Sequence, residues 1–221
     1  MPDMVSVQVK ICGLNDATTL NAAVNAGADY IGLVFFAKSP RSVSPHLAGE
    51  LVAQMPRGTK VKKVGLVVDP SDALILEIMN HVKLDVLQLH GSESPERVQQ
   101  IKEMTGLSVM KALKIADESD LDAANAYFEV ADMLLFDAKA PKTLENALPG
   151  GNGLVFDWRM LQDREFPKAW MLAGGLDQDN VEEAVKISGA KIVDTSSGVE
   201  FWAGMKDADQ IREFVHTVHA I

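Results

Sequence analysis

The sequence is nearly devoid of cysteine. Cys12 is the only one among 221 residues, so no internal disulfide can form. A chain without disulfides suits a reducing compartment, and we expect a cytoplasmic protein. No apolar run approaches the roughly 20 residues that a membrane-spanning helix needs. The opening stretch "MPDMVSVQVK" lacks a basic region followed by an apolar core, which argues against a secretory signal.

Basic residues are also in short supply. The 21 lysines and arginines stand against 31 aspartates and glutamates, for a net charge of −10. Proteins that bind nucleic acid or an anionic membrane need a clustered basic face, so we expect neither partner. An anionic small substrate would need a local positive patch. The five histidines show no zinc-ligand spacing and have no thiolate partners, so we expect no metal site.

What the sequence does contain is a regular alternation of short apolar runs with longer amphipathic segments. The amphipathic segments carry helix start and stop signals, as in "SPERVQQIKEMTG", where Ser94 precedes Pro95 and Gly106 follows the last turn. The runs predict β-strands at residues 7–12, 30–35, 63–68, 86–89, 108–113, 133–136, 169–172 and 192–194. The repeat is about 26 residues long.

Strict alternation of strand and helix implies a parallel sheet with right-handed crossovers. Eight repeats in 221 residues favour an α/β fold, a single-domain (β/α)8 TIM barrel spanning residues 1–221. A doubly wound open sheet is the alternative, but it usually has roughly five or six strands, and "CGLND" is not a glycine-rich dinucleotide turn. Residues 138–154 depart from the pattern, with only a short helical stretch expected near 158–161.

In a barrel of this kind the active site lies at the C-terminal ends of the strands and in the loops that follow. In chain order these ends include "CG", "FFAKSPR", "VVDP", "QLHG", "ALKIA", "LFDAK", "LAGGL" and "DTSSGVE". Several of them carry polar residues or glycines that a purely structural loop does not require. We therefore expect the chemistry to reside in these segments.

Taken together, "VKICGL", "GLVFFAKSPRSVSP", "LQLHG", "LLFDAK", "GGNGLVFDW", "WMLAGGL" and "VDTSSGVE" resemble the phosphoribosylanthranilate isomerases of tryptophan biosynthesis. The motifs occur in family order along nearly the whole chain. Two departures are small. Thr195 stands where the family more often has valine, and "EFWAGMKD" before the last helix is bulkier than usual.

The resemblance implies an Amadori rearrangement of N-(5-phosphoribosyl)anthranilate to the corresponding 1-deoxyribulose 5-phosphate. This reaction needs an acid that protonates the furanose ring oxygen and a base that removes the C2 proton. The substrate's own nitrogen supplies the iminium electron sink, so no cofactor is implied. The expected partner is a small phosphosugar substrate, and the enzyme is expected to be a monomer or a homodimer.

By the same resemblance, Cys12 is the general base and Asp137 the general acid. The residues alone leave other interpretations open, since free cysteine is commonly a buried small hydrophobe and a strand-end aspartate commonly caps a loop. A thiol with a pKa of about 8.5 is only slightly ionised at neutral pH, so the site must stabilise the thiolate or use that small fraction. An acid must keep its proton, for which the apolar Leu135 and Phe136 are available nearby.

The remaining candidates would bind the two ends of the substrate. Arg41 has a planar fork that suits the anthranilate carboxylate, with a solvated surface arginine as the alternative. The phosphate is expected at the loops after the seventh and eighth strands, where glycine lets backbone N–H groups approach the oxygens. The residues expected there are Gly174, Gly175, Ser196, Ser197 and Gly198, with Gly153 in a long sixth loop that could act as a lid.

Three further residues have two open interpretations. Asp194 resembles a family position that contacts the sugar. Lys10 shares the parity of Cys12, points inward one layer below it, and needs a partner if buried. Because the eighth strand neighbours the first in a closed barrel, a Lys10–Asp194 ion pair is equally open. His90 is a candidate substrate contact, with a hydrogen-bonded strand-end histidine as the alternative.

Two rival functions remain. The equivalent aminoaldose–ketose isomerase of histidine biosynthesis shares the fold, but it uses carboxylates at both catalytic positions, so Cys12 argues against it. A non-catalytic phosphosugar-binding barrel is the other rival. The presence of both Cys12 and Asp137 argues against this second possibility.

Overall fold

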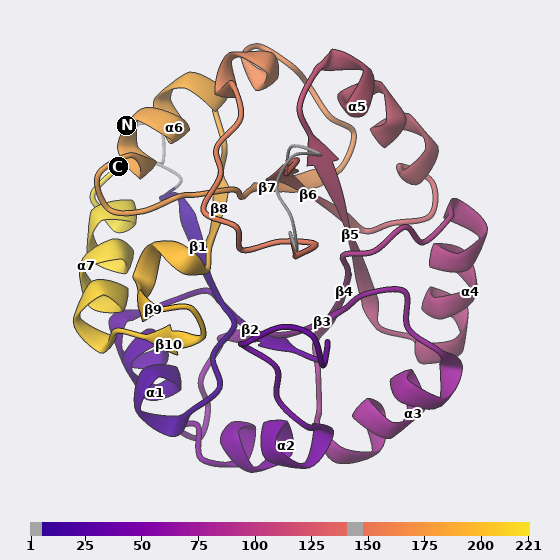
Figure 1. Ribbon diagram of the computed structural model, residues 1–221, viewed down its shortest axis with the longest axis vertical. Coiled ribbons are helices and arrows are strands. Elements are labelled where there is room, and N and C mark those ends of the chain that lie inside the picture. Colours follow the sequence, from indigo (N-terminus) through magenta and orange to yellow (C-terminus); the bar gives the residue numbers. More distant parts are fainter. Residues whose placement is uncertain (1–5, 141–147) are drawn as a thin grey trace.

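The computed structural model describes residues 6–140 and 148–221 of the chain. Its parallel strands are β1 (Gln8–Cys12), β2 (Tyr30–Val34), β3 (Lys62–Val67), β4 (Val86–Leu89), β5 (Ser108–Ile115), β6 (Met133–Ala138), β7 (Ala169–Leu172) and β8 (Ile192–Thr195). They form a closed barrel in sequential order, ringed by helices (Figure 1). The predicted (β/α)8 barrel is confirmed. The open-sheet alternative is wrong, because β1 pairs in parallel with β8.

Helices follow the strands on the outside of the barrel (Figure 1). They are α1 (Ala17–Ala26), α2 (Pro45–Ala53), α3 (Asp72–His81), α4 (Pro95–Thr105), α5 (Glu118–Asp122), α6 (Val181–Ser188) and α7 (Ala208–His219), with 3-10 turns η1 (Ala123–Tyr127), η2 (Trp158–Leu161) and η3 (Ser197–Val199). The predicted signals for α4 are confirmed. The Ser94 side chain accepts a hydrogen bond from the Arg97 amide, and Gly106 ends the helix at φ 65°.

Two segments depart from the predicted regular alternation of strand and helix. The fifth crossover contains the short helix α5 followed by η1, whose few turns are too brief to show a clear apolar period. An antiparallel hairpin of β9 (Glu200–Trp202) and β10 (Met205–Lys206) lies between η3 and α7. This β9–β10 hairpin sits at the rim of the barrel, close to the first and second strands in Figure 1.

The barrel interior is filled by alternate residues of each strand, because successive side chains of a strand point to opposite faces. The apolar residues inside are Tyr30, Val64, Val86, Met110, Ala112, Met133, Leu135, Met171, Ala173 and Ile192. The same alternation puts Cys12 one layer above Lys10 and Asp137 one layer above Leu135. A larger apolar core fills the space between barrel and helices. The strand register therefore delivers polar side chains to one end of the barrel.

Candidate active site

One pocket opens among the C-terminal strand ends and collects nearly all the candidate residues. Those lining it are Cys12, Arg41, His90, Asp137, Gly153, Gly174, Gly175, Asp194, Ser196 and Ser197. Gly198, which we expected beside them, does not line the pocket. A side chain at Gly198 would instead strike the backbone oxygen of Leu176, so packing alone accounts for this glycine.

Cys12 is buried at the end of β1, directly opposite Gly32 of β2. Burial raises the pKa of the Cys12 thiol, and the neighbouring Lys10 ammonium offsets only part of this effect. Asp194 adds a smaller contribution in the same direction as burial. In the ligand-free protein the thiol form is therefore favoured more strongly than in an exposed cysteine.

Gly32 provides the space that the thiol occupies. A Cβ atom at this position would lie 2.8 Å from the Cys12 sulfur and 3.0 Å from its Cα. We expect Gly32→Ala to displace the thiol and lower turnover by about tenfold or more, with a smaller change in KM, because small misplacements of a reacting group are costly. Steady-state kinetics measures the effect.

Gly65→Ala on the adjacent β3 is the matched control for Gly32→Ala. Its methyl group would press on Leu84, away from the pocket residues, and should lower the melting temperature without a comparable loss of turnover. Equal turnover in Gly32→Ala and wild type would show that the position of the thiol is unimportant.

The ion pair between Lys10 and Asp194, one of the two predicted possibilities, is present. Lys10 Nζ lies 2.8 Å from Asp194 Oδ1 in the buried interior, where β1 and β8 pair at these two residues. Burial opposes the charge on Lys10, but Asp194 and then Cys12 outweigh it, and the pKa of Lys10 is raised. Lys10 is thus a cation below the thiol. Asp194 also lines the pocket, so a sugar contact stays compatible with this pairing.

Asp137 and His90 form a second buried pair across the pocket. Oδ2 of Asp137 lies 3.2 Å from Nε2 of His90, and Oδ1 accepts a hydrogen bond from the Ala138 amide at 2.9 Å. Gln88 Nε2 lies 3.0 Å from the other ring nitrogen, Nδ1. With the Gln88 amide as donor, Nδ1 accepts and Nε2 carries the proton toward Asp137. The hydrogen-bonded interpretation of His90 is therefore confirmed.

The loop that carries His90 is held from outside the barrel by Lys111. Its Nζ donates to the Gly91 carbonyl at 2.8 Å, to Glu93 Oε2 at 2.9 Å and to the Leu89 carbonyl at 3.3 Å. Burial lowers the pKa of Lys111, and the Glu93 carboxylate partly offsets this. Neither residue was singled out in the sequence, yet together they fix the backbone on both sides of His90.

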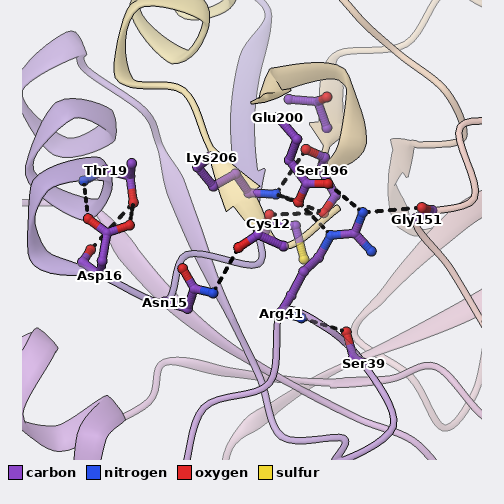
Figure 2. Close-up of polar contacts among 12 residues, drawn as sticks. Cys12, Asn15, Asp16, Thr19, Ser39, Arg41, Gly151, Ser196, Glu200 and Lys206 are labelled. Atoms are coloured by element: carbon purple, nitrogen blue, oxygen red, sulfur yellow. Dashed lines mark hydrogen bonds and ion pairs between the residues drawn. The ribbon is translucent and has the colours of Figure 1, made fainter. Parts of the chain in front are cut away.

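Arg41 is buried and ion-paired, which excludes the predicted alternative of a solvated surface arginine. Its Nε and Nη2 donate to Oε1 and Oε2 of Glu200, each at 2.7 Å (Figure 2). The stem of Arg41 packs over Gly13, where a Cβ atom would lie 2.7 Å from Arg41 Cδ. Lys206 Nζ also contacts Glu200 Oε1, at 2.6 Å. Sequence reasoning missed Glu200 and Lys206, although both lie in the unusual "EFWAGMKD" segment.

Another part of the pocket wall is formed by the loops after β7 and β8. Gly174 and Gly175 have φ angles of 91° and 60°, a region that favours glycine. A Cβ atom at Gly175 would lie 2.9 Å from the Leu154 carbonyl. Ser196 and Ser197 also line this part of the pocket, although the Ser196 hydroxyl donates its proton to the Cys12 carbonyl at 3.1 Å. Backbone amides and hydroxyls of this kind are suited to an anion.

The sixth loop lies across the pocket where it is described. A Cβ atom at Gly150 would lie 2.9 Å from both Asp137 Oδ2 and His90 Nε2. Asn152 closes a small turn, because its side chain accepts from the Leu148 amide at 3.1 Å and donates to the Leu148 carbonyl at 2.8 Å. The predicted lid includes residues 141–147, which lie outside the described part of the chain. Its closing function stays a prediction.

Residues 6–140 and 148–221 contain no group of three or more histidine, cysteine, aspartate or glutamate side chains arranged to hold a metal ion. No helix in these two stretches is long and apolar enough to cross a membrane.

Comparison with known proteins adds an independent result. A sequence profile described as N-(5'phosphoribosyl)anthranilate (PRA) isomerase matches residues 9–217. An N-(5'-phosphoribosyl)anthranilate isomerase of Paracoccus denitrificans is 57% identical over 211 residues, with 96% of each chain covered. The crystal structure of phosphoribosyl anthranilate isomerase from Thermotoga maritima has a TM-score of 0.84 and 34% identity, covering 97% of this chain and 100% of its own.

A second solved structure is informative for its ligand. It is a phosphoribosyl anthranilate isomerase in complex with reduced 1-(o-carboxyphenylamino)-1-deoxyribulose 5-phosphate. It matches with a TM-score of 0.82 and 32% identity, over 97% of this chain and 100% of that one. The bound compound carries a carboxylate at one end and a phosphate at the other.

Proposed function

The chain belongs to the N-(5'-phosphoribosyl)anthranilate isomerase family, and on this premise we propose that Cys12 and Asp137 divide the proton transfers of its reaction. The reaction converts N-(5-phosphoribosyl)anthranilate into 1-(2-carboxyphenylamino)-1-deoxyribulose 5-phosphate, a step of tryptophan biosynthesis. The observation that carries the assignment is the single pocket in which a lone thiol and a buried carboxyl from different strands face the same space.

The proton balance defines what the two groups must do. The ring oxygen gains a proton as the C1–O bond breaks, which leaves an iminium at C1 and a hydroxyl at C4. The C2 proton is then removed, and its bonding electrons neutralise the iminium to give an enolamine. Loss of the C2 hydroxyl proton and addition of a proton at C1 complete the ketone. Two protons are given and two are taken, so both groups return to their starting state.

Asp137 is the proposed acid, with His90 as the residue that shares its proton. The 3.2 Å contact between Asp137 Oδ2 and His90 Nε2 joins two side chains that are both almost fully buried. Gln88 orients the imidazole from its other side. Asp137 would deliver the proton to the ring oxygen while the imidazole supports the resulting carboxylate through a charge-assisted hydrogen bond.

Cys12 is the proposed base, and the raised pKa of its thiol means that only a small fraction of the free enzyme carries the thiolate at neutral pH. Burial disfavours the thiolate, and each positive charge close to it offsets part of that effect. The iminium formed by ring opening is such a charge, and it lies one bond from the carbon whose proton is removed. Lys10, already a cation beneath Cys12, supports the thiolate from below. The base therefore acts from the fraction of enzyme in which the thiol has already lost its proton to solvent, and the iminium formed by ring opening stabilises that thiolate.

The two ends of the substrate give it one orientation. Arg41 would bind the anthranilate carboxylate through its planar fork. The phosphate would lie between the Gly174–Gly175 turn and Ser196–Ser197, held by backbone amides and the Ser197 hydroxyl. Of the lining residues, Arg41 supplies the permanent positive charge, and it lies on a different loop from those glycines. We also place the enzyme in the cytoplasm, since its only thiol would work in reduced form.

The test of the proposed function is direct turnover. Purified protein incubated with N-(5-phosphoribosyl)anthranilate should consume the anomeric C1–H signal and produce a C1 methylene, as followed by NMR, and the gene should restore growth to a tryptophan auxotroph lacking this isomerase. The aminoaldose of histidine biosynthesis serves as the matched alternative substrate. Turnover of that compound alone would contradict the assignment.

A further inference from the structure

The β9–β10 hairpin brings two buried charges onto Arg41. Glu200 and Lys206 stand opposite each other in the hairpin register, and their side chains are only 4% and 0% exposed. The turn of the hairpin packs against the Arg41 loop as well, because a Cβ atom at Gly204 would lie 2.5 Å from the Pro40 carbonyl. Figure 2 shows Glu200 lying between Arg41 and Lys206.

The contacts of Arg41 account for its N–H groups one by one. A guanidinium has five, one on Nε and two on each Nη. Nε and one Nη2 proton go to Glu200, each at 2.7 Å, and the second Nη2 proton goes to the Gly151 carbonyl at 3.3 Å. Within the described part of the chain, Nη1 donates no hydrogen bond. Gly151 lies against the edge formed by Nη1 and Nη2, since a Cβ atom there would be 2.5 Å from Nη1, so a second, planar acceptor uses this edge by displacing Gly151.

We propose that Glu200, fixed by Lys206, is a positioning residue that presents the Nη1–Nη2 edge of Arg41 to the substrate and so sets specificity for a carboxylate on the N-aryl group. This inference rests on the proposed function, because it requires the anthranilate carboxylate to be the ligand of Arg41. The Gly151 carbonyl, on that edge, is the acceptor that an entering carboxylate would replace.

Lys206 makes the net charge of the Arg41–Glu200–Lys206 cluster positive. An Arg41–Glu200 pair alone would be neutral, whereas two cations around one buried carboxylate leave an excess of one positive charge. Burial lowers the pKa of Lys206, an effect that Glu200 opposes. Burial also opposes ionisation of Glu200, but hydrogen bonds from Arg41 and contact with Lys206 outweigh it and lower its pKa. This is the local positive patch that an acidic chain needs to hold an anion.

Lys206 also ties this cluster to the first strand. Its Nζ donates to the Ser196 carbonyl at 2.9 Å and to Ser196 Oγ at 3.2 Å, and Ser196 Oγ donates to the Cys12 carbonyl at 3.1 Å. If the cluster of Arg41, Glu200 and Lys206 had only a structural role, a substitution in it would therefore disturb the position of the Cys12 thiol as well as that of Arg41. A loss confined to binding of the carboxylate would instead indicate that the cluster sets specificity.

The test compares two inert ligands, so it does not depend on catalysis. One is reduced 1-(o-carboxyphenylamino)-1-deoxyribulose 5-phosphate, and the other is its counterpart without the carboxylate. Glu200→Gln retains the shape but turns an amide N–H₂ toward the N–H groups of Arg41. We expect its affinity for the carboxylated ligand to fall by roughly 10- to 100-fold, as for loss of a charge-assisted contact, with that for the other ligand nearly unchanged.

Control variants show whether the effect is specific. Arg41→Lys should lose the same preference, because it keeps the charge without the fork. Trp202→Ala alters the same hairpin at a residue that is 68% exposed and should leave both affinities as in wild type. Melting temperatures of all three variants, with calorimetry for the affinities, identify any general loss of folding.

Each remaining outcome contradicts part of the argument. If wild type itself shows no preference for the carboxylated ligand, the assignment of Arg41 in the proposed function fails, and this inference fails with it. If wild type has the preference and Glu200→Gln keeps it, only the positioning role is wrong. If Glu200→Gln weakens both ligands equally, Glu200 is a scaffold and does not set specificity.

Discussion

Replacing Cys12 by serine is expected to lower turnover by at least about 10²-fold while changing substrate binding little. Serine keeps the shape of the side chain, so the buried site opposite Gly32 should still accept it. Its hydroxyl hardly ionises, however, even beside the iminium and above the Lys10 ammonium. The loss should therefore be confined to the step that removes the C2 proton. Steady-state kinetics and calorimetry with an inert product analogue separate turnover from binding.

The pH dependence supplies a second readout for Cys12. A base works only when deprotonated, and burial raises the pKa of this thiol above its ordinary value, with Lys10 offsetting only part of the effect. The thiolate fraction of the free enzyme therefore increases as pH rises from neutral toward that raised pKa. We expect kcat/KM to rise with pH over the same interval, and Cys12→Ser to lose this rise.

Alkylation is the independent chemical control. Iodoacetamide can modify only Cys12 as a thiol, because the chain has no other cysteine, and inactivation should follow its incorporation one for one. The reaction should be slow, since the thiol is buried and mostly protonated, and a bound product analogue should slow it further. A stoichiometrically alkylated enzyme, or a serine variant, with near wild-type turnover would refute the assignment of Cys12 as base.

Strand positions and inward-facing residues were predictable from the sequence for a physical reason. Successive side chains of a strand point to opposite faces of the sheet, so residue parity alone decides which of them face the barrel interior. Parity placed Lys10 beneath Cys12, and barrel closure placed Asp194 beside it, which is the pairing that the structure contains. The preference of serine for the position before a helix also predicts the capping residue itself, as at Ser94.

The contacts of Arg41 were not predictable in the same way. Glu200 lies 159 positions from Arg41 in the chain, and it reaches the arginine through a hairpin that no periodic pattern announces. A short strand of three residues, paired with one of two, leaves almost no alternation to detect. The sequence shows that "EFWAGMKD" is bulky, but it does not show that Glu200 and Lys206 of this segment meet Arg41.

The glycines expected at the phosphate site show that residue type alone does not identify a functional residue. The sequence grouped Gly175 and Gly198 as phosphate contacts, but a side chain at Gly175 would strike the Leu154 backbone, and one at Gly198 the Leu176 backbone. A substitution such as Gly175→Val would therefore disturb loop packing whether or not an anion binds there. Competition by inorganic phosphate is the cleaner probe of the phosphate site.

The second large effect is expected at Asp137. Asp137→Asn should lower turnover by at least about 10²-fold, because an amide cannot deliver the proton that opens the ring. The amide oxygen can still accept the Ala138 N–H, so the end of β6 should keep its geometry. Binding of an inert product analogue should change little. Asp132→Asn, just before the same strand and outside the pocket lining, is the matched control. Its carboxylate accepts the Val109 amide at 2.9 Å and contacts Lys102 at 2.6 Å, so the variant should lose stability without a comparable loss of turnover.

Deuterium at C2 of the ribose distinguishes the roles of Asp137 and Cys12, because the two variants slow different steps. In Asp137→Asn, ring opening limits the rate and no C2–H bond breaks in that step, so the isotope effect on kcat should approach unity. In Cys12→Ser, removal of the C2 proton limits the rate, and the isotope effect should be at least as large as in wild type. A large isotope effect in Asp137→Asn would show that ring opening does not depend on its carboxyl. The role of acid would then pass to its hydrogen-bond partner His90, where His90→Gln should reproduce the loss.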